Sequence, residues 1–125
     1  MGAWSIDELD TIAKAQELEL TTLRADGTPR KPITIWVVRN GDDLFIRSWR
    51  GDRAAWFRGA QGRKEGRIQA GGTDKDVRFA GADPRIGDEL DTAYRTRYSP
   101  VAPAYVEPML SPQARATKLR IVPRS

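Results

Sequence analysis

The pattern of hydrophobic and polar positions predicts a set of short strands. Residues 17–24 (ELELTTLR) alternate polar and apolar side chains, which indicates a first strand, and a turn at 25–29 follows it. Two further strands are predicted at 31–39 and 43–50. They are joined through Asn40-Gly41, a pair that tolerates the left-handed backbone of tight hairpin turns. The remaining expected strands cover 67–70, 75–80 and 118–122.

Three segments carry helical patterns. Ser5 and Glu8 have the spacing of a capping box, so a first helix is predicted over about 6–16, with Ile6, Leu9, Ile12 and Ala13 on one face. Asp52 is a candidate N-cap for a short helix over 53–59. Asp83-Pro84 predicts the start of a helix that extends to about residue 98. The segment 99–108 contains three prolines and is expected to be irregular.

Taken together, these elements predict a mainly β fold. Six short strands with helices inserted between them do not alternate regularly, which argues against a doubly wound parallel sheet. They favour a small, mostly antiparallel barrel with helices at its edges. A chain of 125 residues is expected to form one domain, 1–125. Its parts would be the helix at 6–16, the barrel at 17–80, the helix at 84–98 and the strand at 118–122.

Composition removes several classes of chemistry. The chain has no Cys and no His, which excludes disulfides, thiolate catalysis, zinc fingers and His-based general catalysis. Any reaction must use carboxylates, Tyr, Lys, Ser or Thr, or a borrowed cofactor. No run approaches the ~20 apolar residues of a membrane-spanning helix, and the first residues lack a signal-peptide pattern. We therefore expect a cytoplasmic protein without a membrane partner and without a metal site.

The residues with the most specific chemistry lie where the strand at 43–50 ends. A phosphate is bound well by a hydroxyl, one or two guanidinium groups and free backbone N–H groups at a helix start. Ser48, Arg50, Gly51 and Arg53 supply all of these within six residues. An apolar hairpin that leads into such a site suits a ligand with a flat ring and a phosphate, which is a flavin-type nucleotide. The alternative is a solvated basic edge that blunts strand pairing.

Aromatic and apolar residues near this site leave two interpretations open. The strand at 31–39 is apolar on both faces, so it requires a covering helix, a partner subunit or a planar ligand on its second face. Trp36, Trp49 and Trp56 could stack on a ring system or on Arg, and they could equally belong to the core or to a dimer interface. Tyr94 could donate a proton, but its spacing from Leu90 favours core packing.

The stretch IWVVRNGDDLFIRSWRG-DRAAWFRGA, with the later DTAYRTRY and ATKLRIVP, resembles a family of small bacterial proteins. That uncharacterised family is grouped with the FMN-binding split barrels, alongside pyridoxamine 5'-phosphate oxidase. The segment is also similar to the deazaflavin-dependent nitroreductases at Arg30 to Pro32, Ser48, Gly51 and Trp56-Phe57. It lacks their Gly-Arg-Lys-Ser-Gly element and has Asp26-Gly27-Thr28-Pro29-Arg30 instead.

The resemblance implies a six-stranded antiparallel split β-barrel of Greek-key type that forms a two-fold homodimer, with FMN at the subunit interface. By position, Lys31, Pro32, Ile33 and Thr34 would border the ring through backbone groups. Ser48, Arg50 and Arg53 would hold the phosphate, and Arg47 and Trp49 would flank it. The resemblance supplies no acid or base side chain, so catalytic residues stay unassigned. The flavin would provide the redox chemistry, and the protein would position and tune it.

Four functions remain open on the sequence. The first is an FMN-dependent oxidoreductase acting on a small organic substrate. The second is a barrel that binds deazaflavin, haem or another anionic ligand without redox work. The third is a basic nucleic-acid-binding module, which a net charge of +4 permits. It ranks below the others because the basic residues are interleaved with acids. The fourth is a structural dimer without a ligand.

Overall fold

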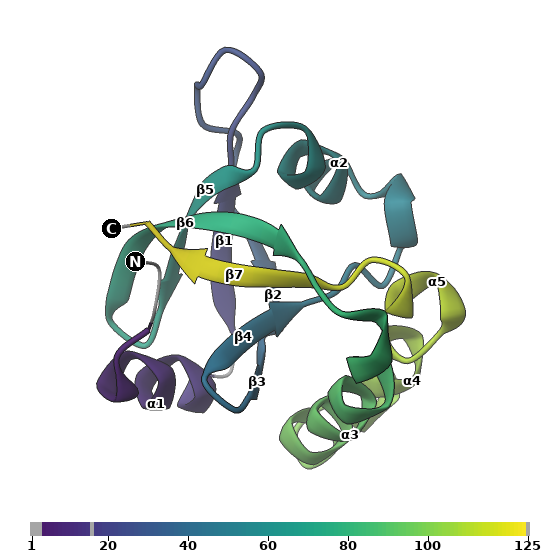
Figure 1. Cartoon of the computed structure of the whole chain (residues 1–125). Coiled ribbons are helices and arrows are strands. Elements are labelled where there is room, and N and C mark those ends of the chain that lie inside the picture. The colour runs from purple at the N-terminus through teal and green to yellow at the C-terminus, as the bar shows by residue number, and fades with distance from the viewer. Residues whose placement is uncertain (1–3, 16, 125) are drawn as a thin grey trace.

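The computed structural model describes residues 4–15 and 17–124, and this part of the chain forms one curled antiparallel sheet with helices around it (Figure 1). The sheet has seven strands in the order β2-β1-β5-β6-β7-β4-β3. Their bounds are β1 (Leu18–Thr22), β2 (Ile33–Ile35), β3 (Val38–Asn40), β4 (Asp43–Ile46), β5 (Glu65–Ala70), β6 (Thr73–Gly81) and β7 (Leu119–Pro123).

The order of the strands shows that the sheet curls back on itself. β2 and β3 lie at opposite edges of the sheet, yet only Trp36 and Val37 separate them in the chain. The three steps from Ile35 to Val38 span at most about 10 Å, so the two edges must approach each other. The result is a split β-barrel, and the predicted mainly β, antiparallel architecture is confirmed with seven strands in place of six.

The seventh strand arises because the predicted strand at 31–39 is broken in two. β2 pairs with β1, placing Ile33 opposite Leu20, whereas β3 pairs with β4, placing Val38 opposite Phe45. At the break, the Val37 N–H donates to the Tyr98 hydroxyl (3.1 Å), which in turn donates to the Val37 carbonyl (3.0 Å). The backbone groups of Val37 are therefore satisfied by a side chain instead of by a neighbouring strand.

Five α-helices and three short 3₁₀ turns surround the sheet in the described residues. The first helix carries the predicted capping box, because Ser5 Oγ accepts from the Glu8 N–H and Glu8 Oε1 accepts from the Ser5 N–H. It ends at Lys14, earlier than predicted, and residue 16 lies outside the described residues. The helices are α1 (Ile6–Lys14), α2 (Ala55–Gly62), α3 (Gly87–Tyr98), α4 (Val106–Met109) and α5 (Pro112–Arg115). The 3₁₀ turns are η1 (Gly51–Arg53), η2 (Pro84–Ile86) and η3 (Pro103–Tyr105).

Several predicted boundaries were wrong. Asp52 does not cap a helix: it lies inside η1, and α2 begins only after Ala54, which has an extended backbone and makes no side-chain cap. The strands expected at 67–70 and 75–80 are longer. β5 pairs along its whole length with the first six residues of β6, β1 pairs with β5 on its other side, and β7 pairs with the end of β6. The segment expected to be irregular at 99–108 contains η3 and most of α4.

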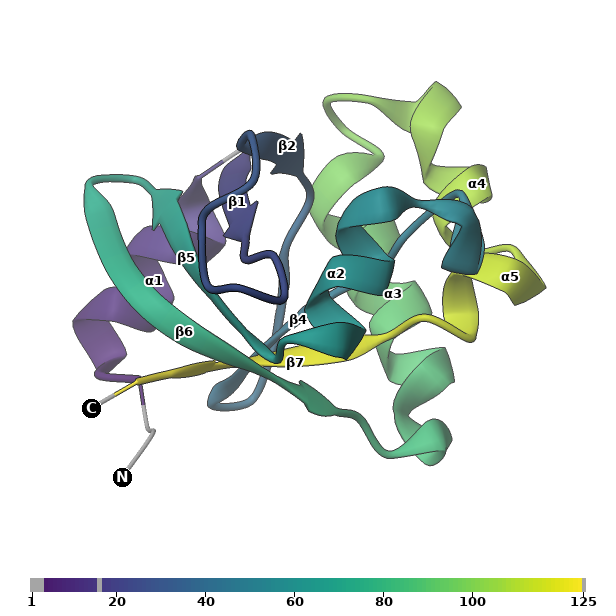
Figure 2. The same cartoon turned by 90° about the horizontal axis from the view of Figure 1, so that it is seen from above.

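Two hydrophobic cores flank the sheet. The larger one fills the barrel and includes Leu9, Leu18, Leu44, Phe57 and Ile68. The smaller one joins Val38 and Phe45 of the sheet to residues of α3 and α4, namely Leu90, Tyr94, Tyr98, Val106 and Met109. Figures 1 and 2 show α3, α4 and α5 grouped at one side of the barrel, away from α1. Among the described residues, no helix is long and apolar enough to cross a bilayer.

Candidate functional site

Ser48 lies two residues after the end of β4, at the junction where anion binding was predicted. Its backbone is held firmly, because the Ser48 N–H donates to Thr117 Oγ1 (2.9 Å) and the Ser48 carbonyl accepts from the same hydroxyl (3.3 Å). The Ser48 side chain is buried, but its Oγ has no hydrogen-bond partner among the described residues. Buried hydroxyls are almost always paired, so the Ser48 Oγ is an exception at this junction.

The turn that follows Ser48 is shaped by Gly51. Gly51 has φ +68°, a conformation that favours glycine, and its N–H donates to the Ser48 carbonyl (3.0 Å). Gln113 Nε2 in α5 donates to the Trp49 carbonyl (3.0 Å), which fixes the turn from the other side. The Trp49 side chain is 57% exposed, and the Arg50 guanidinium lies 5.8 Å from the centre of its ring. The turn therefore presents an aromatic and a cationic group at the surface.

The arginines of this junction have no acidic partners. Arg50 and Arg53 are exposed and form no ion pair with any described residue, and the same holds for Lys31 of the segment before β2. On β5 and β6, by contrast, Arg67 pairs with both Asp74 and Asp76. The positive charge of Arg50 and Arg53 is thus not neutralised by the described part of the chain, which is what an anion site requires.

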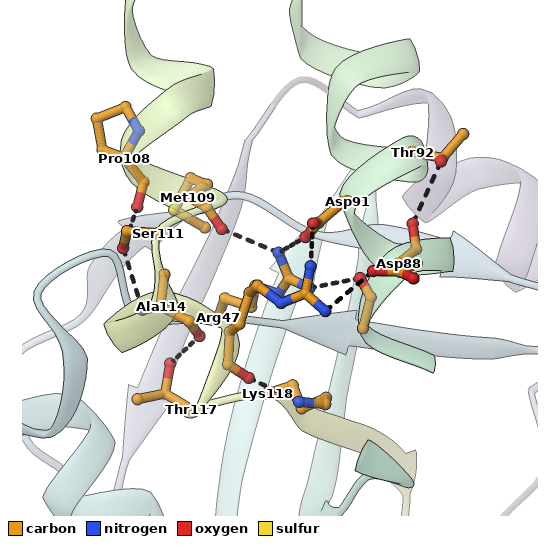
Figure 3. Close-up of polar contacts among 12 residues, drawn as sticks. Arg47, Asp88, Asp91, Thr92, Pro108, Met109, Ser111, Ala114, Thr117 and Lys118 are labelled. Carbon is orange, nitrogen blue, oxygen red and sulfur yellow. Dashed lines mark hydrogen bonds and ion pairs between the residues drawn. The ribbon is translucent and has the colours of Figure 1, made fainter. Parts of the chain in front are cut away.

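Arg47 does not belong with these surface groups. It is 1% exposed, and its Nη1 donates to Asp91 Oδ1 (2.6 Å) and to the Met109 carbonyl (2.9 Å), while its Nη2 donates to the Gly87 carbonyl (3.0 Å) (Figure 3). Its guanidinium therefore ties the end of β4 to α3 and α4. Successive side chains of an extended chain point to opposite sides, so Arg47 faces the helices and Ser48 does not. Arg47 was expected to flank the phosphate, but its guanidinium is held inside the protein by Asp91.

The acid that binds Arg47 also binds a second arginine. Arg115 of α5 donates to Asp91 Oδ2 and lies 3.1 Å from Asp88 Oδ1 (Figure 3). The neighbouring Lys118 donates to the Arg115 carbonyl, and its pKa is lowered first by burial and then by the charges of Arg47 and Arg115. This network was not predicted from the sequence, because it joins residues that are far apart in the chain.

The segment before and within β2 lies at a free edge of the sheet. β2 pairs with β1 on one side only, so backbone groups on its other side have no strand partner. Lys31, Pro32 and Thr34 are exposed, and Ile33 is half-buried against the barrel core. Val38 of β3 lies opposite Phe45 of β4, so the link from β2 to β3 passes the end of β4 that leads into Arg47 and Ser48.

The other aromatic candidates are part of the fold. Trp36 stacks on Tyr98, with ring centres 4.0 Å apart, so α3 covers this face of the predicted strand. Tyr94 is fully buried in the smaller core, which confirms core packing for its ring, and burial raises the pKa of its hydroxyl far above the ordinary value. Trp56 is half-buried against the barrel core and meets Phe57 edge to face.

A groove of about 460 Å³ lies elsewhere, between α1, β3 and α3. None of the nine residues predicted to bind a cofactor lines it. In the chain from 4 to 15 and from 17 to 124, no three acidic side chains come together as a metal site would need. The groove is therefore not the predicted cofactor site.

The fold is that of the split-barrel proteins related to pyridoxamine 5'-phosphate oxidase. The chain belongs to the family described as "Uncharacterized protein conserved in bacteria (DUF2255)", whose model matches residues 8–121. A comparison with curated proteins found no match.

Among solved structures, the chain is similar to the heme storage protein HutZ from Vibrio cholerae (TM-score 0.63, 14% identity, 93% of this chain and 87% of that one). It is similar to an F420 reductase (TM-score 0.56, 19% identity, 92% and 90%). It also resembles a putative pyridoxamine 5'-phosphate oxidase from Listeria innocua (TM-score 0.58, 11% identity, 93% and 88%). At these identities the likeness establishes the fold.

Proposed function

We propose that this protein is a homodimeric FMN-binding oxidoreductase of small organic substrates, with the flavin phosphate held at the β4–α2 junction. The observation that carries the proposal is the combination found there. Within residues 4–15 and 17–124, the buried Ser48 hydroxyl has no hydrogen-bond partner, and the glycine turn after it carries two exposed arginines without acidic partners. Such a set of donors matches the chemistry of a phosphate monoester, which accepts several charge-assisted hydrogen bonds.

The names of the structural neighbours support a cofactor of this type. They include an F420 reductase, a putative pyridoxamine 5'-phosphate oxidase and a protein from Mycobacterium smegmatis described as binding FAD and heme. Each of these shares the split barrel with our chain. A flavin also suits a chain without His and Cys, because the bound cofactor supplies the redox chemistry.

The chain's own residues would divide the work by position. Arg50 and Arg53 would grip the phosphate with their guanidinium groups, and Ser48 would donate its hydroxyl. The backbone of Lys31 to Thr34 at the free edge of β2 would border the ring, with Trp49 beside the phosphate. Because Arg50, Arg53 and Trp49 are exposed in a single chain, a second subunit would cover the site and exclude water. The protein would work in the cytoplasm.

The experiment is a titration of the purified protein with FMN, followed by quenching of flavin fluorescence. We expect Ser48→Ala combined with Arg53→Ala to weaken binding at least tenfold, because a charge-assisted contact contributes about 1.5–3 kcal/mol. Arg78→Ala is the matched control, since Arg78 is an exposed arginine on β6 that forms no ion pair with the described residues. Equal FMN affinity in the double variant and in the control would refute the phosphate site.

The same titration separates the proposal from its alternatives. Binding of deazaflavin in place of FMN would leave the proposed site unchanged and replace the cofactor. Deazaflavin is worth testing because the basic segment before β2, Ser48 and Gly51 are similar to the deazaflavin-dependent nitroreductases. Binding of either cofactor without reduction by a nicotinamide donor would indicate a binding protein without redox activity. Analytical ultracentrifugation with and without FMN tests the dimer, which the proposal requires.

A further inference from the structure

The groove between α1, β3 and α3 is a second concave surface whose chemistry differs from that of the β4–α2 junction. Its volume of about 460 Å³ falls within the range of small-molecule sites. On α3 the lining residues follow one helical face, three and four positions apart. They are Glu89, Thr92, Ala93, Thr96 and Arg97, and the opposite wall consists of Ala13, Val37, Val38 and Arg39.

Two of the three charged side chains that line the groove already have hydrogen-bond partners within the protein. Arg39 donates to Asp10 Oδ1 (2.8 Å) and to the Gly41 carbonyl (2.8 Å). Glu89 Oε2 accepts from Asn40 Nδ2 (2.8 Å). Both groups therefore have partners at the β3 end of the groove.

Arg97 is different, because it has no acidic partner among the described residues. Its Nη2 donates to the Ala15 carbonyl, and its guanidinium lies 5.3 Å from the centre of the Tyr98 ring. Its Nε is buried and makes no hydrogen bond. A half-buried guanidinium without a counter-charge is costly, and a bound anion would offset that cost.

The remaining walls define the rest of the ligand. Ala13 and Ala93 are small, apolar and half-buried, so they accept a compact apolar body, whereas Val37 and Val38 are packed into the two cores. A single unpaired guanidinium matches one carboxylate better than a doubly charged phosphate. Glu89 is about two helical turns from Arg97, roughly 12 Å along the axis, which limits its repulsion of an anion at Arg97.

We propose that this groove binds a small organic monocarboxylate, with Arg97 holding the carboxylate and Ala13 and Ala93 contacting an apolar body. The inference is independent of the flavin proposal, because none of Ser48, Arg50 and Arg53 lines the groove. Loss of FMN binding in the Ser48 and Arg53 variants would leave it unaffected.

The test is a titration of the full-length protein with benzoate and with butyrate, followed by calorimetry and by amide chemical shifts. Benzamide is the neutral probe matched to benzoate. We expect a carboxylate to bind with shift changes at Val38 and Thr96, and benzamide to bind at least about tenfold more weakly, because it lacks the charge. Arg97→Gln should weaken carboxylate binding at least about tenfold. Arg95→Gln, an exposed arginine on the same helix and outside the groove, should leave binding unchanged.

A second variant tests the groove independently, in case Arg97→Gln does not fold. Ala93→Leu fills the groove from α3 and should abolish carboxylate binding while the circular dichroism spectrum stays native. The proposal is overturned if neither carboxylate binds, or if benzamide binds as well as benzoate. It is equally overturned if Ala93→Leu binds normally, if both arginine variants lose affinity alike, or if the shift changes lie at the Ser48 turn.

Discussion

The Tyr98 hydroxyl bonds to both backbone groups of Val37, accepting from its N–H at 3.1 Å and donating to its carbonyl at 3.0 Å. The two residues lie 61 positions apart in the chain. This one side chain holds the chain where it passes from one edge of the sheet to the other, and its ring also stacks on Trp36. Tyr98 therefore connects α3 to the closure of the barrel.

Tyr98→Phe should destabilise the protein by about 1–3 kcal/mol, because it leaves a buried N–H and a buried carbonyl without partners while the ring contacts remain. Urea denaturation measures this change in the free energy of unfolding. Tyr105→Phe is the control, since Tyr105 is 69% exposed and should tolerate the loss of its hydroxyl. Equal stability of the two variants would show that the closure does not depend on the Tyr98 hydroxyl.

Asp91→Asn should cost about 3–5 kcal/mol, because it leaves the fully buried Arg47 guanidinium without its carboxylate. Thermal and urea unfolding both report this loss. Asp88→Asn provides the comparison, since the Asp88 side chain is 92% exposed and contacts only Arg115 of this network. A loss of stability as large for Asp88→Asn as for Asp91→Asn would contradict the role assigned to the Arg47–Asp91 pair.

Two strand glycines should respond in opposite ways to a methyl group. A Cβ on Gly66 would lie 2.3 Å from the Thr21 carbonyl oxygen and 3.0 Å from the Phe79 ring, whereas a Cβ on Gly81 would meet nothing within 4 Å. Gly66→Ala should therefore destabilise the protein by about 1–3 kcal/mol or more through overpacking. Gly81→Ala should be neutral or slightly stabilising, because it restricts the unfolded chain. Urea denaturation measures the free energy of unfolding of both variants. Similar values for the two would refute the close approach of β1 to β5.

The interactions of Glu8 make the stability of the protein depend on pH in the acid range. The Lys75 hydrogen bond lowers the pKa of Glu8 below its ordinary value of 4.5, with a further contribution from the Ser5 N–H. A lowered pKa means that the stabilisation is present above pH 4.5 and is lost as the pH falls through the folded-state pKa. Glu8→Gln should therefore be less stable than the wild type at neutral pH, and the difference should shrink in acid. Urea unfolding at several pH values measures this difference in stability, and Lys75→Gln should show the same trend. A difference that grew in acid would contradict the role given to the Glu8–Lys75 pair.

Much of the secondary structure could be predicted because it depends on local chemistry. The capping box of α1, the hairpin between β3 and β4 and the Pro84 helix start could all be predicted from residues close together in the chain. The hairpin turn itself is shifted by one residue from the prediction: Asn40 pairs with Asp43, and Gly41 and Asp42 form the turn, with only Gly41 in the left-handed conformation. The residues of the candidate anion site could also be proposed from the sequence, because Ser48, Arg50, Gly51 and Arg53 are neighbours in the chain. Where they point and what they contact could not be predicted, because that depends on remote elements.

The sequence by itself determined the mainly β antiparallel fold, since alternating apolar positions and turn residues act over a few residues. Only the tertiary structure decided that one predicted strand becomes β2 and β3, because the partner of Val37 is a hydroxyl 61 positions away. Likewise, only the tertiary structure separated the buried Arg47 from the exposed Arg50 and Arg53. Their side chains are alike in sequence, and the difference comes from Asp91, which α3 places 2.6 Å from Arg47.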